Sequence, residues 1–368
     1  MSVYRGRTAI AAAALSLAVS LTACGTAGES AGSGGADSGE GGFTVGLLFS
    51  QIVQTRWEKF DKPLIERKLK ELCEDCRVEY GNAEGDVATQ QQLVDTLINK
   101  DVEVLILSAV NFRSLRSAVE RAHDAGIPVV AYDGLVEGPI SGYVSFDNER
   151  VGKLQGEALL KAMGDRADGG RIVMMNGPQT SPTNIAFKKG ALSALQGKVE
   201  IGKTYDIQGW KQESAHANMV RAVAALGADG IDGVYAANDG LASGVISALK
   251  ASDIEPLPPV TGQDADLPAV RHIISGEQYM SVYKPFKAEA DAAAEMAVAL
   301  GRGENLDDIA ETTVDTATTK DIPAVLLDPI PVTVDDIEDT VVKDGVYTTD
   351  QICTPRFASA CERAGLIE

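Results

Sequence analysis

The sequence predicts an α/β protein built from two doubly wound parallel-sheet lobes in tandem. Short runs of Val, Ile and Leu alternate with helical segments along most of the chain. Continuous apolar runs are typical of strands buried on both faces, and the alternation is typical of a parallel sheet covered by helices on both sides. The pattern begins again near Glu149, which indicates a second lobe of the same kind.

The elements of each lobe follow in order from this pattern. In the first lobe we expect strands at 44–49, 77–80, 104–107, 129–132 and 142–145, with helices at 56–72, 87–99 and 112–125. In the second lobe we expect strands at 171–175, 201–205, 233–236 and 260–262, with helices at 149–163, 187–195, 212–226, 242–251 and 267–275. A strand at 279–282, an Ala-rich helix at 286–300, a strand at 324–327 and a short helix at 335–342 complete the pattern.

The N-terminus has the layout of a secretory signal peptide at residues 1–23. Arg5 and Arg7 precede an apolar stretch that is too short to span a bilayer. Small residues then lead to Cys24, and the run L-T-A-C at 21–24 resembles the lipobox of bacterial lipoproteins, in which Cys24 would be lipidated. An ordinary signal peptide with an incidental cysteine is the alternative. Residues 24–42 are mostly Gly, Ser, Ala and acidic residues, a composition typical of a flexible tether.

Charge and motif content exclude several function classes. The formal net charge of -20 argues against nucleic acid and anionic membrane surfaces as partners, because both require basic patches. The chain lacks a G-x-G-x-x-G turn after its first strand, a Walker A sequence and a G-x-S-x-G elbow. His123, His216 and His272 lie within predicted helices among charged or small residues. We therefore expect neither an enzyme nor a metal or cofactor site.

Four cysteines other than Cys24 form two close pairs, Cys73 with Cys76 and Cys353 with Cys361. An even set of closely spaced cysteines in an exported protein predicts two local disulfides. A C-x-x-C motif can also be a redox site. Here, however, the pair follows a charged helix and precedes a strand, whereas a thioredoxin-like pair opens a helix directly after a strand.

Polar side chains follow the predicted strands in both lobes. They are Ser50, Gln51, Asn82, Asn111, Asp133, Asp147, Asn148, Asn176, Asn238, Asp239, Gln263 and Asp264. Each alone could be a turn or helix-cap residue, since Asn and Asp are favoured there. Ligands of open α/β sheets bind at the carboxyl ends of the strands, so the recurrence predicts a shared cleft lined by hydrogen-bonding groups. Such groups suit a neutral polyol.

Several stretches resemble the type I periplasmic sugar-binding proteins of ABC importers, most closely the D-xylose-binding and multiple-sugar-binding proteins. The resemblance covers Phe43 to about Tyr347. The most specific stretches are Q-T-R-W at 54–57, V-S-F-D-N-E at 144–149, A-N-D at 237–239, G-Q-D-A-D-L at 262–267, V-Y-K-P at 282–285 and D-T-V-V-K-D-G at 339–345.

The resemblance implies a set of sugar-binding residues. They are Arg56, Trp57, Asp133, Asn184, Trp210, Asn238, Asp264 and Lys284. The charged and amide groups would bond sugar hydroxyls, and the two tryptophans would pack on the sugar ring. Core packing is the alternative for the tryptophans. Relatives often have Arg where this chain has Gly134, and acidic residues where it has Ser50-Gln51, so another pentose or a hexose such as glucose or galactose remains open beside D-xylose.

The resemblance also implies the domain plan and the partners. We expect an N-terminal lobe at 43–146 with 284–321, a C-terminal lobe at 147–283 with 322–346, a three-strand hinge between them, and a tail at 347–368. The lobes would close on a monosaccharide and deliver it to an ABC permease and its ATPase, at the outer face of the bacterial cell membrane. A sugar-sensing subunit for a receptor is the alternative. A transcriptional repressor of the same fold would need a basic DNA-binding module, which an acidic, exported chain opposes.

Overall fold

The structure is a computed structural model that describes residues 41–50 and 56–368. The predicted signal peptide, Cys24 and nearly all of the linker lie outside the described residues, as do Gln51, Gln54 and Thr55. Among the residues described, no helix is both long enough and apolar enough to cross a membrane.

The first sheet has seven strands in the order β11-β12-β5-β4-β3-β1-β2. Its strands are β1 (Thr44–Phe49), β2 (Arg77–Asn82), β3 (Val104–Leu107), β4 (Val129–Tyr132), β5 (Gly142–Phe146), β11 (Thr312–Val314) and β12 (Ile322–Leu327). All neighbours are parallel except β11 and β12. β1 lies between β2 and β3, with Val45 paired to Val78 on one side and to Val104 on the other.

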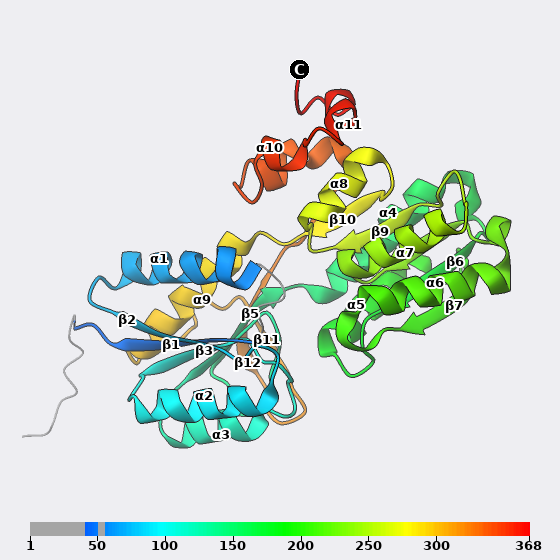
Figure 1. Cartoon of the computed structure of the whole chain (residues 1–368). Helices are drawn as coiled ribbons and strands as arrows, with labels where there is room; N and C mark the ends of the chain where they lie inside the picture. The colour runs from blue at the N-terminus through cyan, green and yellow to red at the C-terminus, as the bar shows by residue number, and fades with distance from the viewer. Residues whose placement is uncertain (1–40, 51–55) are drawn as a thin grey trace, which may run out of the picture. The chain divides into compact units, whose positions relative to one another are not determined.

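Both faces of this sheet are buried, as the continuous apolar runs predict. In β4, Val130 and Tyr132 belong to the core shared with α1 (Lys62–Leu72) and α9 (Phe286–Gly301). Val129 and Ala131 belong to the opposite core, shared with α2 (Val87–Asn99) and α3 (Arg116–Asp124). Figure 1 shows these two helix pairs on the two faces of the sheet.

The second sheet has six strands in the order β13-β10-β9-β8-β6-β7. The strands are β6 (Arg171–Asn176), β7 (Glu200–Asp206), β8 (Gly233–Ala236), β9 (Val260–Gln263), β10 (Met280–Tyr283) and β13 (Ile330–Val332). The helices of this part are α4 (Asn148–Met163), α5 (Pro182–Leu195), α6 (Gln212–Leu226), α7 (Asp239–Ala251) and α8 (Leu267–Ser275). The two doubly wound α/β lobes are therefore present.

Each sheet also carries one antiparallel edge strand that the sequence pattern did not indicate. β11 pairs antiparallel with β12, and β13 pairs antiparallel with β10. Both strands have only three residues, too few to show a periodic pattern. Pro331 lies within β13, and an edge strand accepts a proline because one side of its backbone needs no sheet partner.

The chain passes between the two sheets three times, after β5, after β10 and after β12. The third passage differs from the expected boundary at residue 322. Ile322–Leu327 pairs with β5 in the first sheet, and Ile322 and Ala324 are buried in the first lobe's core. The returning segment of the C-terminal lobe therefore begins after Leu327, because the apolar residues of β12 are needed to complete the first sheet.

The segment that follows β13 packs on α8 and holds the C-terminus. It contains the short helices η5 (Val334–Asp336), η6 (Glu338–Val342), α10 (Thr349–Ile352) and α11 (Ala358–Arg363). Its apolar residues form a separate core with residues of α8. The structure pairs Cys353 with Cys361 here, and Cys73 with Cys76 after α1, in the two local disulfides that the spacing predicts.

Candidate functional site

A cavity of about 450 Å³ lies at the strand ends of both sheets, within the size range of small-molecule sites. Seven of the eight predicted ligand residues line it: Arg56, Trp57, Asp133, Trp210, Asn238, Asp264 and Lys284. The first three follow strands of the first sheet, and the other four follow strands of the second sheet. The structure thus brings residues more than 200 positions apart around one space.

Asn184 is the exception, and its predicted place needs correction. Its side chain is only 2% exposed and does not line the cavity. Its Oδ1 accepts a 2.7 Å hydrogen bond from the backbone N–H of Gly177, and its Nδ2 donates to the carbonyl of Pro178 at 3.1 Å. Asn184 therefore supports the loop after β6 instead of facing a ligand.

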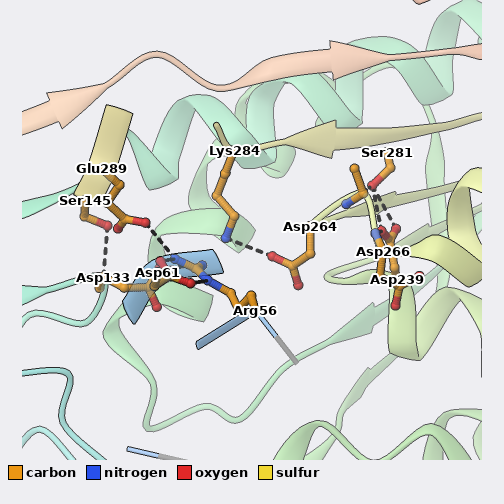
Figure 2. A network of polar contacts seen from close by, with 11 residues as sticks. Arg56, Asp61, Asp133, Ser145, Asp239, Asp264, Asp266, Ser281, Lys284 and Glu289 are labelled. Carbon is orange, nitrogen blue, oxygen red and sulfur yellow. Dashed lines mark hydrogen bonds and ion pairs between the residues drawn. The ribbon is translucent and has the colours of Figure 1, made fainter. Parts of the chain in front are cut away.

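Arg56 forms the centre of a buried charged network in the first lobe (Figure 2). Its Nη2 lies 2.8 Å from Oδ1 of Asp61 and 2.7 Å from Oε2 of Glu289, and its Nη1 lies 3.4 Å from Oδ1 of Asp133. The phenol of Tyr132 also donates to Asp61. Three carboxylates surround one guanidinium, which is the residue type best suited to several planar hydrogen bonds at once.

The environment shifts the ionisation of this network. Burial alone would lower the pKa of Arg56, but the carboxylates of Asp61, Asp133 and Glu289 raise it above its usual value. Burial raises the pKa of Glu289 to about 8, and Asp133 and Asp61 add to the rise although Arg56 opposes it. The cavity therefore keeps a cation on its wall, with a carboxyl behind it whose pKa is raised to about 8.

Lys284 supplies the second cation, on the segment that leaves β10. Its Nζ lies 2.9 Å from Oδ1 of Asp264 and 5.9 Å from the ring of Phe187. Burial acts to lower the pKa of Lys284, but Asp264 and Asp133 raise it overall. Asp264 and Asp133 are each about a third exposed, so their free oxygens can accept hydrogen bonds from a ligand.

The two cavity aspartates both have a positive φ. Asp133 has a φ of 61° and Asp264 a φ of 102°, both in the region that L residues rarely adopt. Each backbone N–H donates at 2.9 Å to the next strand, Asp133 to Val144 and Asp264 to Val282. Such strain is retained where the surrounding structure fixes it, and it is common at binding sites.

Asp239 holds the turn that carries Asp264. Its carboxylate is completely buried and accepts from Ser281 Oγ at 2.8 Å and from the Asp266 N–H at 3.1 Å (Figure 2). It also accepts from Gln278 Nε2 at 2.9 Å. Burial raises the pKa of Asp239 well above its usual value, with Asp266 and Asp264 adding to the rise. A Cβ on Gly262 would lie 2.1 Å from the Asp239 carboxylate, so only glycine leaves room for it.

The two tryptophans differ in their surroundings. Trp57 is 3% exposed, and its ring centroid lies 5.1 Å from that of Phe49. The guanidinium of Arg56 lies over the Trp57 ring. Trp57 is therefore both a core residue and part of the cavity wall. Trp210 is only partly buried, and its indole lies against Gly177. Trp210 is thus the ring with more surface available to a ligand.

Part of the strand-end pattern is explained by helix capping, as the alternative interpretation holds. Asp147 caps α4 and Asn238 caps α7, accepting from Arg150 and Leu241 respectively. Asn238 also lines the cavity, so the two interpretations are compatible at one residue. Asn111 accepts from the backbone of the following turn and lines the cavity as well.

Sequence reasoning missed Asp61 and Glu289, which lie behind Arg56. Both are completely buried, yet they occur inside helical segments of a chain in which most acids face solvent. The one available signal is that Glu289 lies in a helix otherwise rich in Ala and apolar residues. Within residues 41–50 and 56–368, no group of three or more His, Cys, Asp or Glu is arranged to hold a metal ion.

Comparisons with known proteins identify the family of the chain. The model of the periplasmic binding protein domain matches residues 45–305. The D-xylose-binding periplasmic protein of Escherichia coli strain K12 is 35% identical over 314 residues, which cover 84% of this chain and 92% of that protein. The multiple sugar-binding periplasmic receptor of Rhizobium radiobacter is 30% identical over 329 residues, which cover 84% of this chain and 92% of that protein.

A solved structure of a solute-binding protein is also similar to this chain. The ABC transporter solute-binding protein of Clostridium phytofermentans, determined with bound β-D-glucose, matches with a TM-score of 0.77 and 27% identity, covering 84% of this chain and 99% of that one. The family model covers well over half of the chain, and the relatives are aligned along nearly their whole length. The chain therefore belongs to the family of periplasmic binding protein domains.

Proposed function

We propose that this protein binds a monosaccharide outside the cytoplasm and delivers it to an ABC sugar importer. The observation that carries the proposal is the cavity at the strand ends of both sheets, where Arg56, Asp133, Asp264 and Lys284 meet two tryptophans. Carboxylates accept from sugar hydroxyls, cations donate to them, and an indole packs on the apolar C–H face of the ring. The proposal is for binding, not for catalysis.

The relatives support a sugar as the ligand. Two of them are described as D-xylose-binding and multiple sugar-binding proteins, and the solved relative holds β-D-glucose. We propose D-xylose or a related sugar. A Cβ at Gly134 would meet nothing within 4 Å, so this part of the cavity wall has free space that the CH₂OH group of glucose or galactose could occupy.

The proposed mechanism is hinge closure. Three chain segments connect the two sheets, at residues 147, 284–285 and 328–329. Rotation about such connections would let the two sets of strand-end groups approach a bound sugar from opposite sides. The ligand-bound form would then dock on a membrane permease driven by its ATPase, so that the bound sugar controls when the importer is engaged.

Binding is tested by titration calorimetry of the chain from Gly25 onward against D-xylose, D-glucose, D-galactose and other pentoses and hexoses. We expect saturable one-site binding of at least one sugar. His123→Ala, at an exposed position on α3, is the matched control and should leave the affinity unchanged. If no monosaccharide binds at millimolar concentration, the proposed function is wrong although the fold stands.

Lipid anchoring is a separate proposal that rests on the L-T-A-C run ending at Cys24. In the native host, Cys24→Ala should release the protein from the membrane fraction, because the lipidated residue is lost. Sugar binding by the released protein should match that of the parent. Cys24→Ala protein that stays in the membrane fraction would rule out the anchor.

A further inference from the structure

Glu289 lies behind the cavity and has no place in its lining. It is completely buried on α9, and its Oε2 accepts from Nη2 of Arg56 at 2.7 Å, whereas its Oε1 has no hydrogen-bond partner among the described residues. A buried carboxyl is costly, and it is retained where its charge or its hydrogen bond is needed. Its contact with Arg56 suggests what that need is.

The donors of Arg56 divide into two groups. The Nε N–H donates to Asp61 Oδ2 at 3.0 Å, and the two N–H groups of Nη2 donate to Asp61 Oδ1 and Glu289 Oε2. A guanidinium has five N–H donors, so these three contacts leave only the two on Nη1. One of them faces Asp133 at 3.4 Å, a long contact to a residue that lines the cavity. The Nη1 edge is therefore the part of Arg56 that a ligand can engage.

We propose that Glu289 is a positioning residue, which together with Asp61 fixes the guanidinium of Arg56 so that its Nη1 edge is presented to the ligand. The inference rests on the proposed function, because it assigns a role to a residue that does not itself touch the ligand. The ionised carboxylate should hold Arg56 more firmly than the neutral acid, because it adds the attraction between opposite charges to the hydrogen bond.

Glu289 and Lys284 lie on the same segment of the chain. Glu289 stands five residues after Lys284, and the segment between them is one of the three connections between the sheets. One end of the segment pairs with Asp264 of the second lobe, and the other end pairs with Arg56 of the first. A single connecting segment thus positions charged ligand-facing groups of both lobes.

The proton state of Glu289 gives a readout that a purely structural role would not produce. Six groups act on it: Arg56 and Asp61 from the helical segment after β1, Tyr132 of β4, Asp133 directly after β4, Tyr143 on β5, and Lys284. Burial raises the pKa of Glu289 to about 8, so the residue is largely protonated at pH 7 and largely ionised at pH 9. If the ionised form positions Arg56, sugar affinity should rise as pH rises through about 8.

The experiment measures the affinity for D-xylose and D-glucose at pH 7 and pH 9 in the parent, Glu289→Gln and Glu289→Ala. The parent should bind several-fold more tightly at pH 9. Glu289→Gln keeps an acceptor for Nη2 but cannot ionise, so its affinity should stay near the parent's pH 7 value at both pH values. Glu289→Ala should bind about tenfold more weakly, because one Nη2 donor is left without a partner.

Glu295→Gln is the matched control, because Glu295 lies on the same helix and pairs with Lys68 outside the cavity. It should reproduce the parent's affinity and pH profile. Thermal unfolding of each variant separates a loss of folding from a loss of binding. Should Glu289→Ala fail to fold, the pH profiles of the parent and Glu289→Gln still decide the question.

The two proposals can fail separately. A parent that binds sugar with the same pH profile as Glu289→Gln would overturn the positioning role and leave the proposed function intact. The same conclusion would follow if folded Glu289→Ala bound as tightly as the parent. If the parent binds no monosaccharide of the calorimetry panel at either pH, the proposed function and this inference both fall.

Discussion

The turns that carry Asp133 and Asp264 are counterparts in the two lobes, and they are supported by different means. Both residues follow a parallel strand, have positive φ, donate a backbone hydrogen bond to the next strand and pair with a cavity cation. In the first lobe, the carbonyl of Asp133 accepts from the hydroxyls of Tyr143 and Ser145. In the second lobe, the buried carboxylate of Asp239 holds the turn instead.

The two cavity cations differ in the number of buried acids that surround them. Arg56 is surrounded by three carboxylates, two of them completely buried, whereas Lys284 pairs with Asp264 alone among the described residues. The first lobe therefore places its buried acids around the cation, and the second places its buried acid under the turn. Each side of the cavity therefore presents one aspartate with positive φ and one cation, and different buried groups hold them in place.

The largest expected effect comes from removing the two cations. Arg56→Met removes the cation that pairs with the fully buried Asp61, and breaking a buried ion pair in this way costs about 3–5 kcal/mol of folding free energy. Lys284→Met leaves only Asp264, which is partly exposed and can be solvated, so we expect a loss of about 1 kcal/mol. Urea unfolding of both variants measures the difference. Equal losses would show that the two charge arrangements do not differ in energy.

The alanine variants of the two aspartates should lose similar amounts of sugar affinity but differ in folding stability. Asp133→Ala and Asp264→Ala each remove a charged acceptor, and each should cost about 1.5–3 kcal/mol of binding free energy, a tenfold or larger fall in sugar affinity. Only Asp264→Ala leaves a buried cation without a carboxylate, since Arg56 keeps Asp61 and Glu289.

Calorimetry and thermal unfolding of the two aspartate variants test this together. We expect a clearly lower melting temperature for Asp264→Ala and a small change for Asp133→Ala. Trp210→Ala should weaken binding by a comparable amount, through lost packing on the sugar ring. If Asp264→Ala and Trp210→Ala bind the best sugar as tightly as the parent, the assignment of the cavity as the sugar site is wrong.

The comparison also explains what the sequence could predict. Asp133 and Asp264 were found because each directly follows a short apolar strand, and the carboxyl ends of parallel strands converge at one edge of a sheet. Asp61 and Glu289 were missed because a carboxylate inside a helix shows no direction in the sequence, and most acids of this chain are solvated. Asn184 was misplaced because its position at the start of α5 does not reveal that its amide turns towards the backbone of the preceding loop.

The fold was predicted more completely than the site, except at its edges. Most of the central parallel strands are short apolar runs, and their burial on both faces is visible in the residues themselves. The edge strands β11 and β13 have three residues each, and their pairing depends on where the chain returns after α9. The boundary at residue 322 was misplaced for the same reason, because nothing local to β12 indicates which sheet it joins.

The smallest expected effect concerns two glycines on opposite sides of the site, Gly177 and Gly134. A Cβ on Gly177 would lie 2.1 Å from the indole of Trp210, so Gly177→Ala must displace that ring. A Cβ on Gly134 would meet nothing within 4 Å.

We expect Gly177→Ala to lower D-xylose affinity about fivefold, close to 1 kcal/mol, through the shifted indole. Gly134→Ala should leave both the melting temperature and D-xylose affinity unchanged. The quenching of tryptophan fluorescence on sugar addition reports on Trp57 and Trp210 together, and the part that comes from Trp210 should diminish in Gly177→Ala but not in Gly134→Ala. A normal quench with normal affinity in Gly177→Ala would mean that the indole does not contact the ligand, and the second lobe would then bind the sugar through its polar groups only.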